Sequence, residues 1–275
     1  MAPGDRLVVT AEHGGCRVPA RLVGRFRGRR AWLESHRGHD PGSLVLARAL
    51  ARAFGATLVA TTVSRLVVET NRSPGHPALF SAATRGLPHA EKEWLLARYY
   101  RPHRQRAEQA IRRALETGAR VVHLAVHTFT PVLDGAVRRA DVGLLYDPKR
   151  AGERRLSIAW QRALGHSAPE LRARRNYPYR GTADGLTTFF RRRFSTPRYL
   201  GIELEVNQRF PAGPGAPWRA LRAVLIDSLA AALGETARRA PHSRRRRRGN
   251  SIQPLLRNIS SSTTATTSMS TRKNG

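Results

Sequence analysis

Polar side chains follow two apolar segments of this sequence at the points where strands are expected to end. Residues 6–11 form a predicted buried strand that runs into His13, and residues 121–126 form another that runs into His127. In open α/β sheets, ligands bind beyond the carboxyl ends of the strands, so the two histidines are expected to meet there. Histidines in this position are typical zinc ligands of hydrolases. The pattern therefore predicts a metal-assisted hydrolase.

A catalytic zinc needs a third protein ligand, and the sequence offers several. Asp40 is one, although an Asp shortly before a predicted helix often caps that helix instead. Cys16 is another, although a lone cysteine is usually a small buried residue. The candidates that the residues alone leave open are Glu12, Cys16, His36, His39 and Asp40.

The predicted strand over 199–207 carries two carboxylates, Glu203 and Glu205, on the face opposite its apolar side chains. A carboxylate in the middle of a buried strand is costly unless it is paired or bound to a ligand. One role for such a group is that of a general base beside a metal, and the alternative is an ion pair with an arginine. His123 shares a face with His127 and is interpreted as a core residue.

Basic and amide side chains flank a further predicted strand, residues 66–70. Arg65 precedes it, and Asn71 and Arg72 follow it. Arginine binds a carboxylate through two parallel hydrogen bonds, so these residues are candidates to hold a substrate carboxylate. Arg139, near the strand that carries His127, is another cationic candidate. The alternative is that these arginines are only surface charge.

Strand patterns alternate with helical patterns along the chain. This alternation predicts an α/β fold with a mixed, largely parallel sheet sandwiched by helices. Helices are expected over 43–54, 88–117 with a break at Pro102, 150–164, 183–194 and 218–238. Strands are expected over 6–11, 56–62, 66–70, 121–126, 142–146 and 199–207.

Composition limits the class of protein. The chain has 275 residues and a formal net charge of +30, but its arginines are scattered and are interpreted mostly as solvated charge. A catalytic domain over 1–239 is expected to precede a disordered tail over 240–275, which is Arg-rich and then Ser/Thr-rich. This tail could bind nucleic acid weakly. A single cysteine, no signal peptide and no long apolar run predict a cytoplasmic protein without a membrane span.

Seven short segments stand in the same order as in one known family. They are EHGG at 12–15, HDPG at 39–42, SRLVVETNR at 64–72, HTFTP at 127–131, RADVGLLY at 139–146, NYPYRG at 176–181 and ELEVNQ at 203–208. Together they make the chain resemble the N-formylglutamate amidohydrolase family over about residues 6–235. The segments over 64–72 and 127–131 are the most specific. The resemblance implies a fold similar to that of zinc carboxypeptidases.

The resemblance also implies roles for individual residues. It implies zinc as cofactor, with His13, Asp40 and His127 as its ligands. It further implies that Glu205 is the general base, and that Asn71 and Arg72, assisted by Arg65, hold a carboxylate. The expected reaction is hydrolysis of the amide of a small molecule, an N-formyl or N-acyl amino acid such as N-formylglutamate. The alternatives are an Arg-rich nucleic-acid-binding protein and an inactive hydrolase fold that serves as a binding module.

Overall fold

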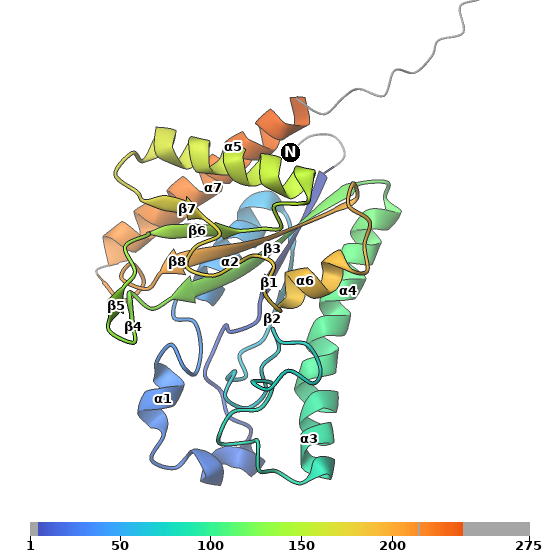
Figure 1. Ribbon diagram of the computed structural model, residues 1–275, viewed down its shortest axis with the longest axis vertical. Coiled ribbons are helices and arrows are strands. Elements are labelled where there is room, and N and C mark those ends of the chain that lie inside the picture. Colours follow the sequence, from blue (N-terminus) through green and yellow to red (C-terminus); the bar gives the residue numbers. More distant parts are fainter. Residues whose placement is uncertain (1–4, 214, 239–275) are drawn as a thin grey trace, which may run out of the picture. The chain divides into compact units, whose positions relative to one another are not determined.

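The protein forms a six-stranded sheet with helices on both faces, which confirms the predicted mixed, largely parallel α/β fold (Figure 1). This computed structural model describes residues 5–213 and 215–238. The strands of the sheet are β1 (Asp5–Ala11), β2 (Thr57–Ala60), β3 (Arg120–Phe129), β6 (Val142–Leu145), β7 (Ala173–Arg175) and β8 (Tyr199–Asn207), and a separate hairpin pairs β4 (Val132–Leu133) with β5 (Ala136–Val137). The order in the sheet is β2-β1-β3-β8-β6-β7, and only β6 and β8 pair in an antiparallel manner.

The strands β3 and β8 lie at the centre of the sheet and are buried along almost their whole length. Strands that are covered on both faces appear in the sequence as nearly continuous apolar runs, which makes their pattern clear. Their register places His127 beside Glu205 and Ala125 beside Glu203. Because β3 continues to Phe129, His127 lies within the strand rather than after it. The sheet therefore brings polar groups together near one end of these two strands.

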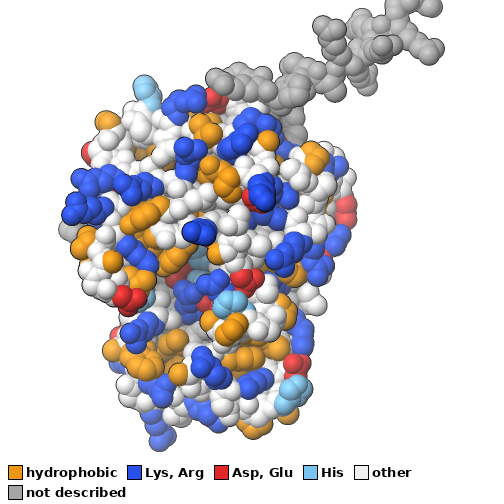
Figure 2. Space-filling model, in the orientation of Figure 1, with side chains coloured by type: hydrophobic (Ala, Val, Ile, Leu, Met, Phe, Trp, Pro, Cys, Tyr) orange, Lys and Arg blue, Asp and Glu red, His pale blue; other side chains and the backbone are white. Residues whose placement is uncertain are grey.

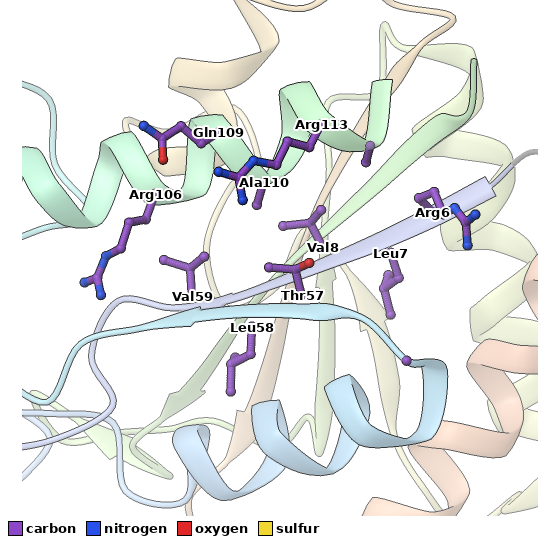
Figure 3. A pocket seen from close by; sticks show the side chains of 12 residues that line it. Arg6, Leu7, Val8, Thr57, Leu58, Val59, Arg106, Gln109, Ala110 and Arg113 are labelled. Atoms are coloured by element: carbon purple, nitrogen blue, oxygen red, sulfur yellow. The ribbon is translucent and has the colours of Figure 1, made fainter. Parts of the chain in front are cut away.

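Two layers of helices cover the two faces of the sheet. One layer consists of α2 (Ser43–Phe54), α5 (Ala151–Ser167) and α7 (Gly215–Arg238), and the other of α4 (Arg101–Glu116) and α6 (Leu186–Arg191). Successive side chains of a strand point to opposite layers. Figure 3 shows Val8 and Val59 directed toward α4, and Leu7 and Leu58 directed to the other face. Each layer thus encloses its own apolar core.

A third apolar cluster lies outside these two layers, in the chain between β1 and α4. The elements around it are a 3₁₀ helix (Ala20–Phe26), α1 (Arg30–Glu34) and α3 (His89–Leu95). Val67 and Val68 are buried in this cluster, and the Val67 N–H donates to the carbonyl of Ser64 at 2.9 Å. The strand predicted over 66–70 is therefore wrong. Its apolar residues fill a local core instead of pairing with the sheet.

Other predicted elements differ in their bounds. The helical region over 88–117 is continuous: α3 leads into a π-helical segment, Leu96–Tyr100, and then into α4. Pro102 lies in the first turn of α4, where the missing N–H is tolerated, so the predicted break is wrong. α5 is longer than expected and α6 is shorter. The edge strand β7 has only three residues and no apolar pattern that predicts it.

Three further sequence predictions concern membrane spans, the C-terminal tail and the cellular location. In the described ranges, no helix is both long and apolar enough to cross a membrane. The tail predicted over 240–275 lies outside the described residues, and the domain boundary at residue 239 stays a prediction. The cytoplasmic location also stays a prediction.

His123 is fully buried in β3, in agreement with its interpretation as a core residue. Its Nε2 lies 2.9 Å from Thr10 Oγ1, and its Nδ1 lies 2.7 Å from the hydroxyl oxygen of Tyr199. Burial removes the hydration of the charged ring and lowers the pKa of His123 to about 4. The ring is therefore neutral near pH 7.

We expect the variant His123→Gln to have a weaker dependence of stability on acid than the wild type. The folded-state pKa of about 4 lies below the ordinary value of 6.5, so the unfolded state binds more protons and stability falls as the pH drops from 6.5 toward 4. Between pH 6.5 and 4.5 the wild type should lose about 2 kcal/mol more unfolding free energy than the variant. Urea denaturation at several pH values measures this difference. Parallel pH profiles for the two proteins would contradict the assignment.

Candidate metal centre and active site

Three buried side chains from separate parts of the chain converge near the carboxyl ends of β1 and β3. Nδ1 of His13 and Nδ1 of His127 lie 3.2 Å and 3.0 Å from the same oxygen of Asp40, Oδ2. One ligand atom from each residue lies within 4.8 Å of the other two. Two imidazole nitrogens and a carboxylate oxygen are a donor set that zinc binds. The structure thus brings together three residues that the sequence singles out as candidate ligands.

The position of Asp40 depends on the turn that precedes α2. Its backbone N–H donates to the carbonyl of His13 at 2.9 Å, which ties the two segments together. Gly42 then turns the chain with a φ of 83°, and a Cβ there would lie 2.5 Å from the Cβ of Pro211. Only glycine combines this conformation with so close an approach. The alternative role of Asp40 is not observed, because no side chain caps the start of α2.

Each histidine presents its other ring nitrogen to a second buried carboxylate. Nε2 of His13 lies 2.5 Å from Glu69 Oε1, and Nε2 of His127 lies 3.1 Å from Glu12 Oε2. Glu12 is fully buried and also lies 3.5 Å from Nε2 of His103. Histidines that bind a metal usually donate their second N–H to such a group, which orients the ring. The residues therefore fit a metal ion bound on the Nδ1 side.

The acids of this cluster remain ionised although they are buried. Burial raises the pKa of Asp40, but His13, His127 and Arg65 outweigh it and hold that pKa well below its usual range. Burial lowers the pKa of His127, but its contacts with Asp40 and Glu12 raise that pKa well above 6.5. The pKa of His13 is also raised, because its neighbouring carboxylates outweigh burial and Arg65. The cluster consequently attracts a cation, either protons or a metal ion.

Arg65 lies beside two of these acids and balances part of their charge. Its Nη2 lies 2.6 Å from Glu69 Oε2, and its Nη1 lies 3.4 Å from Asp40 Oδ1. Burial lowers the pKa of the guanidinium, but the two carboxylates outweigh it and raise that pKa above its usual value. Arg65 therefore holds Asp40 and Glu69 in place, in addition to lining the neighbouring cavity.

Glu205 lies beside His127 in the sheet and is buried, and its Oε2 has no hydrogen-bond partner among the described residues. Burial raises the pKa of Glu205 to about 8, and the charge of Asp40 adds to this shift. On its other side it pairs with Gly143 of β6, where a Cβ would lie 1.9 Å from the carbonyl oxygen of Tyr177. A buried carboxyl group with a pKa near neutrality is suited to proton transfer.

A cavity of about 180 Å³ joins the His13–Asp40–His127 cluster to the residues expected to bind a carboxylate. Asn71, Arg72 and Glu205 all line it. Oδ1 of Asn71 accepts the N–H of Leu186 at 2.7 Å, and Nη1 of Arg72 donates to the carbonyl of Asp184. In the described ranges, no hydrogen bond is formed by the side-chain nitrogen Nδ2 of Asn71 or by Nε and Nη2 of Arg72. These donors are therefore available to a ligand.

Several candidates from the sequence do not line this cavity. Arg139 is exposed, and Cys16 is half-buried away from the cluster. Nδ1 of His39 lies 3.0 Å from the carbonyl oxygen of Leu33, and His36 is also absent from the lining. Of the five candidates for a third ligand, Asp40 alone faces both Nδ1 atoms, while Glu12 lies on the opposite side of His127.

Other residues that shape the site were given no role in the sequence analysis. Nη1 of Arg104 donates to the carbonyls of Thr70 and Arg72 at 3.2 Å and 3.1 Å and supports the turn that carries Asn71. Residues such as Arg104 lie in helices and loops, whereas the sequence predictions rest mainly on polar residues at the ends of predicted strands. Glu69 alone lies in a segment that marks the family. The residues missed are Glu69, His103, Arg104 and Asp184.

A larger cavity, of about 420 Å³, lies between α4 and the strands β1 and β2 (Figure 3). Val8, Val59 and Ala110 contribute apolar surface to it, and Arg6 and Arg113 contribute charge. Its lining contains no His, Cys, Asp or Glu, so it lacks the groups that bind zinc or transfer protons. The chemistry is therefore expected in the smaller cavity.

Comparison with known proteins agrees with this arrangement. The model of the N-formylglutamate amidohydrolase family matches residues 5–210, a range that contains all the cluster residues described above. The chain belongs to this family. Its membership confirms the resemblance found in the sequence and shows the protein to be a hydrolase of the amidohydrolase type. No curated protein matches the sequence.

Two solved structures share the fold. A gene product from Agrobacterium tumefaciens is 30% identical, with a TM-score of 0.74, over 86% of this chain and 92% of that chain. The N-formylglutamate amidohydrolase from Ralstonia eutropha is 21% identical, with a TM-score of 0.62, over 87% of this chain and 97% of that chain, and supports the fold alone. A metallo-carboxypeptidase from Burkholderia cenocepacia has a TM-score of only 0.38, which carries no argument.

We expect Glu69→Gln to lower the zinc affinity of this amidohydrolase about 10–100-fold, because the substitution removes the charge that orients His13. Competition with a chelating dye measures the dissociation constant. The matched control is Glu34→Gln, which removes an exposed carboxylate paired with Arg30. Equal affinities in the two variants would show that Glu69 does not support the metal.

We also expect zinc binding to release protons. Both site histidines have pKa values above 6.5 when no metal is bound, and each must lose a proton to ligate through Nδ1. At pH 6.5 more than one proton per zinc should be released, and the affinity should rise as the pH increases. Calorimetry in buffers with different ionisation enthalpies measures this number. A binding enthalpy that is independent of the buffer would contradict it.

Proposed function

We propose that this protein is a metal-dependent hydrolase that cleaves the amide of an N-formyl or N-acyl amino acid such as N-formylglutamate. The observation that carries the proposal is the geometry of one small cavity. It contains the His13–Asp40–His127 cluster, the buried carboxyl group of Glu205 and the unoccupied donors of Asn71 and Arg72. Amide hydrolysis needs an activated water, a group that transfers protons and groups that bind and orient the substrate. The cluster, Glu205 and the Asn71–Arg72 pair can supply these in turn.

The proposed cofactor is zinc. The donor set of two imidazoles and one carboxylate, with carboxylates behind both imidazoles, matches zinc better than magnesium or calcium, which prefer oxygen ligands. A zinc ion held there would act as a Lewis acid and activate water. Glu12 and Glu69 would orient the two histidine ligands, and Arg65 would hold Asp40 and Glu69.

Glu205 is proposed as the general base and later the general acid. It would accept a proton from the attacking water and deliver it to the nitrogen of the leaving amine. Its position beside His127 places it next to the metal-binding cluster. Burial raises its pKa to about 8, close enough to neutral pH for the group to take up and release a proton in one cycle.

Asn71 and Arg72 are proposed to bind the carboxylate of the substrate. The guanidinium of Arg72 is already oriented by the carbonyl of Asp184, so little side-chain freedom remains to be lost on binding. The cavity of about 180 Å³ is small and favours a formyl group over a large acyl group. Arg139 is exposed and lies outside this cavity, so it could act only on the substrate as it approaches the cavity.

The alternative functions have less support. Lys and Arg side chains are spread over the face shown in Figure 2 rather than gathered in one patch, which does not favour a nucleic-acid site. An inactive binding module would not need the unpaired carboxyl group of Glu205, whose burial is costly.

The test is hydrolysis of N-formyl amino acids by the purified protein after loading with zinc. We expect Glu205→Gln to lower kcat by about 10²–10⁴-fold, the usual effect of losing a general base, while about one zinc per chain remains bound. Formate release and elemental analysis provide the two measurements.

His127→Ala is the complementary variant, since it should lose both the zinc and the activity. If Glu205→Gln instead loses its zinc, Glu205 is a ligand and not the base. If the zinc-loaded wild type hydrolyses no N-formyl or N-acyl amino acid, the proposed function is wrong.

A further inference from the structure

A second carboxylate, that of Glu203, lines the same cavity and has no role in the mechanism above. It is half-buried, and its Oε1 accepts a hydrogen bond from Thr187 Oγ1 at 2.5 Å. In the part of the chain that the structure describes, no Lys, Arg or His nitrogen lies within 4.0 Å of this carboxylate. Glu203 therefore presents a negative charge to the cavity that the protein itself does not balance.

Two other carboxylates that line the cavity, Asp184 and Glu205, also lack a Lys or Arg nitrogen within 4.0 Å in the described part of the chain, but Asp184 accepts hydrogen bonds from Ser73 and Glu205 is the proposed general base. Other acids near or below the surface of the sheet have arginine partners. Asp5 pairs with Arg120 at 2.6 Å, and Asp141 pairs with Arg209 at 2.8 Å. Glu203 is held only by the hydroxyl of Thr187 and has no other assigned role, so its carboxylate is free to pair with a cation supplied by a ligand.

Glu203 lies close to Asn71, which together with Arg72 is proposed to bind the substrate carboxylate. Gly185 lies between them: a Cβ built there would be 3.2 Å from Oε1 of Glu203 and 3.4 Å from Oδ1 of Asn71. Glycine at this position leaves space beside both groups. Glu203 is also two residues from Glu205 on the same strand, and so on the same face. A substrate held by Asn71 with its amide at Glu205 would have its side chain close to Glu203.

The arginines around the cavity do not favour an anionic side chain at this inner position. Arg65 is shared between Asp40 and Glu69, and Arg72 is assigned to the substrate carboxylate. Arg180 lines the cavity but is exposed to solvent, so its charge is screened. A second carboxylate on the substrate would have to lie near Glu203 without a cation to separate the two like charges.

We propose that Glu203 selects substrates with a positively charged side chain, so that this amidohydrolase prefers N-formyl or N-acyl derivatives of basic amino acids over N-formylglutamate. This inference rests on the proposed function for the position of the substrate. The ammonium or guanidinium group of the side chain replaces the missing protein partner of Glu203. The charge-assisted hydrogen bond is stronger than one to a neutral group.

The test compares three probes on the zinc-loaded protein: N-formyl-L-lysine, its neutral analogue N-formyl-L-norleucine, and N-formyl-L-glutamate. Values of kcat/KM are measured for the wild type, and dissociation constants are measured by calorimetry with the Glu205→Gln variant. We expect the lysine derivative to exceed the norleucine derivative by about tenfold or more in both measurements. The glutamate derivative should be no better than the norleucine derivative.

Glu203→Gln keeps the shape of the side chain and removes its charge, so the ratio of lysine to norleucine derivative should fall to about one. Glu203→Asp keeps the charge and should retain part of the preference, whereas the exposed control Glu170→Gln should change nothing. Zinc content confirms that each variant is folded.

The two proposals fail in different ways. An absence of hydrolysis for all three probes and for their N-acetyl counterparts overturns the proposed function, and the dissociation constants then still decide the role of Glu203. A wild-type preference for the glutamate derivative, or a ratio of lysine to norleucine derivative that Glu203→Gln leaves unchanged, overturns the inference about Glu203.

Discussion

The cost of burying charge governs the architecture of this site. Glu12, Asp40 and Glu69 are all buried, and each lies against at least one histidine. A buried carboxylate without a partner is strongly unfavourable, so these groups can persist only as a mutually neutralising set. Within that set both Nδ1 atoms lie close to one oxygen of Asp40. The same constraint that stabilises the fold locally thus gathers the donor atoms on which the proposed metal site rests.

The sheet and the loops contribute to the site in different ways. Parallel pairing of β1, β3 and β8 aligns the strand ends and sets His127 beside Glu205 with little freedom. The residues that line the rest of the cavity come from turns that do not pair with the sheet. Those turns are held by the third apolar cluster and by buried hydrogen bonds, such as the one from the Tyr100 hydroxyl to the carbonyl of Arg72 at 2.7 Å. A rigid scaffold with braced loops is a common arrangement for an active site.

The two carboxylates of β8 show how environment separates similar residues. Glu205 is buried beside the His13–Asp40–His127 cluster, and burial raises its pKa to about 8. Glu203 is more exposed and holds a hydrogen bond from Thr187. Alternate side chains of a strand point to the same face, so both carboxylates reach one cavity. Their surroundings differ, and for this reason Glu205 is proposed to transfer protons and Glu203 to recognise the substrate.

Sequence by itself determined the fold class and most of the cluster. The apolar runs that lead to His13 and His127, and the amphipathic helix that begins at Ser43, are visible in the sequence because burial of central strands and of one helix face imposes a local pattern of apolar residues. The strand expected over 66–70 failed because an apolar run shows that residues are buried but not what they are buried against. The family resemblance already favoured Asp40 as the third ligand, but only the tertiary structure showed that Asp40 lies against both histidines whereas Cys16 and His39 do not. The contacts of Glu69, His103, Arg104 and Asp184 also appeared only in the tertiary structure. Those contacts join residues far apart in the chain, and no local spacing encodes the distance between them.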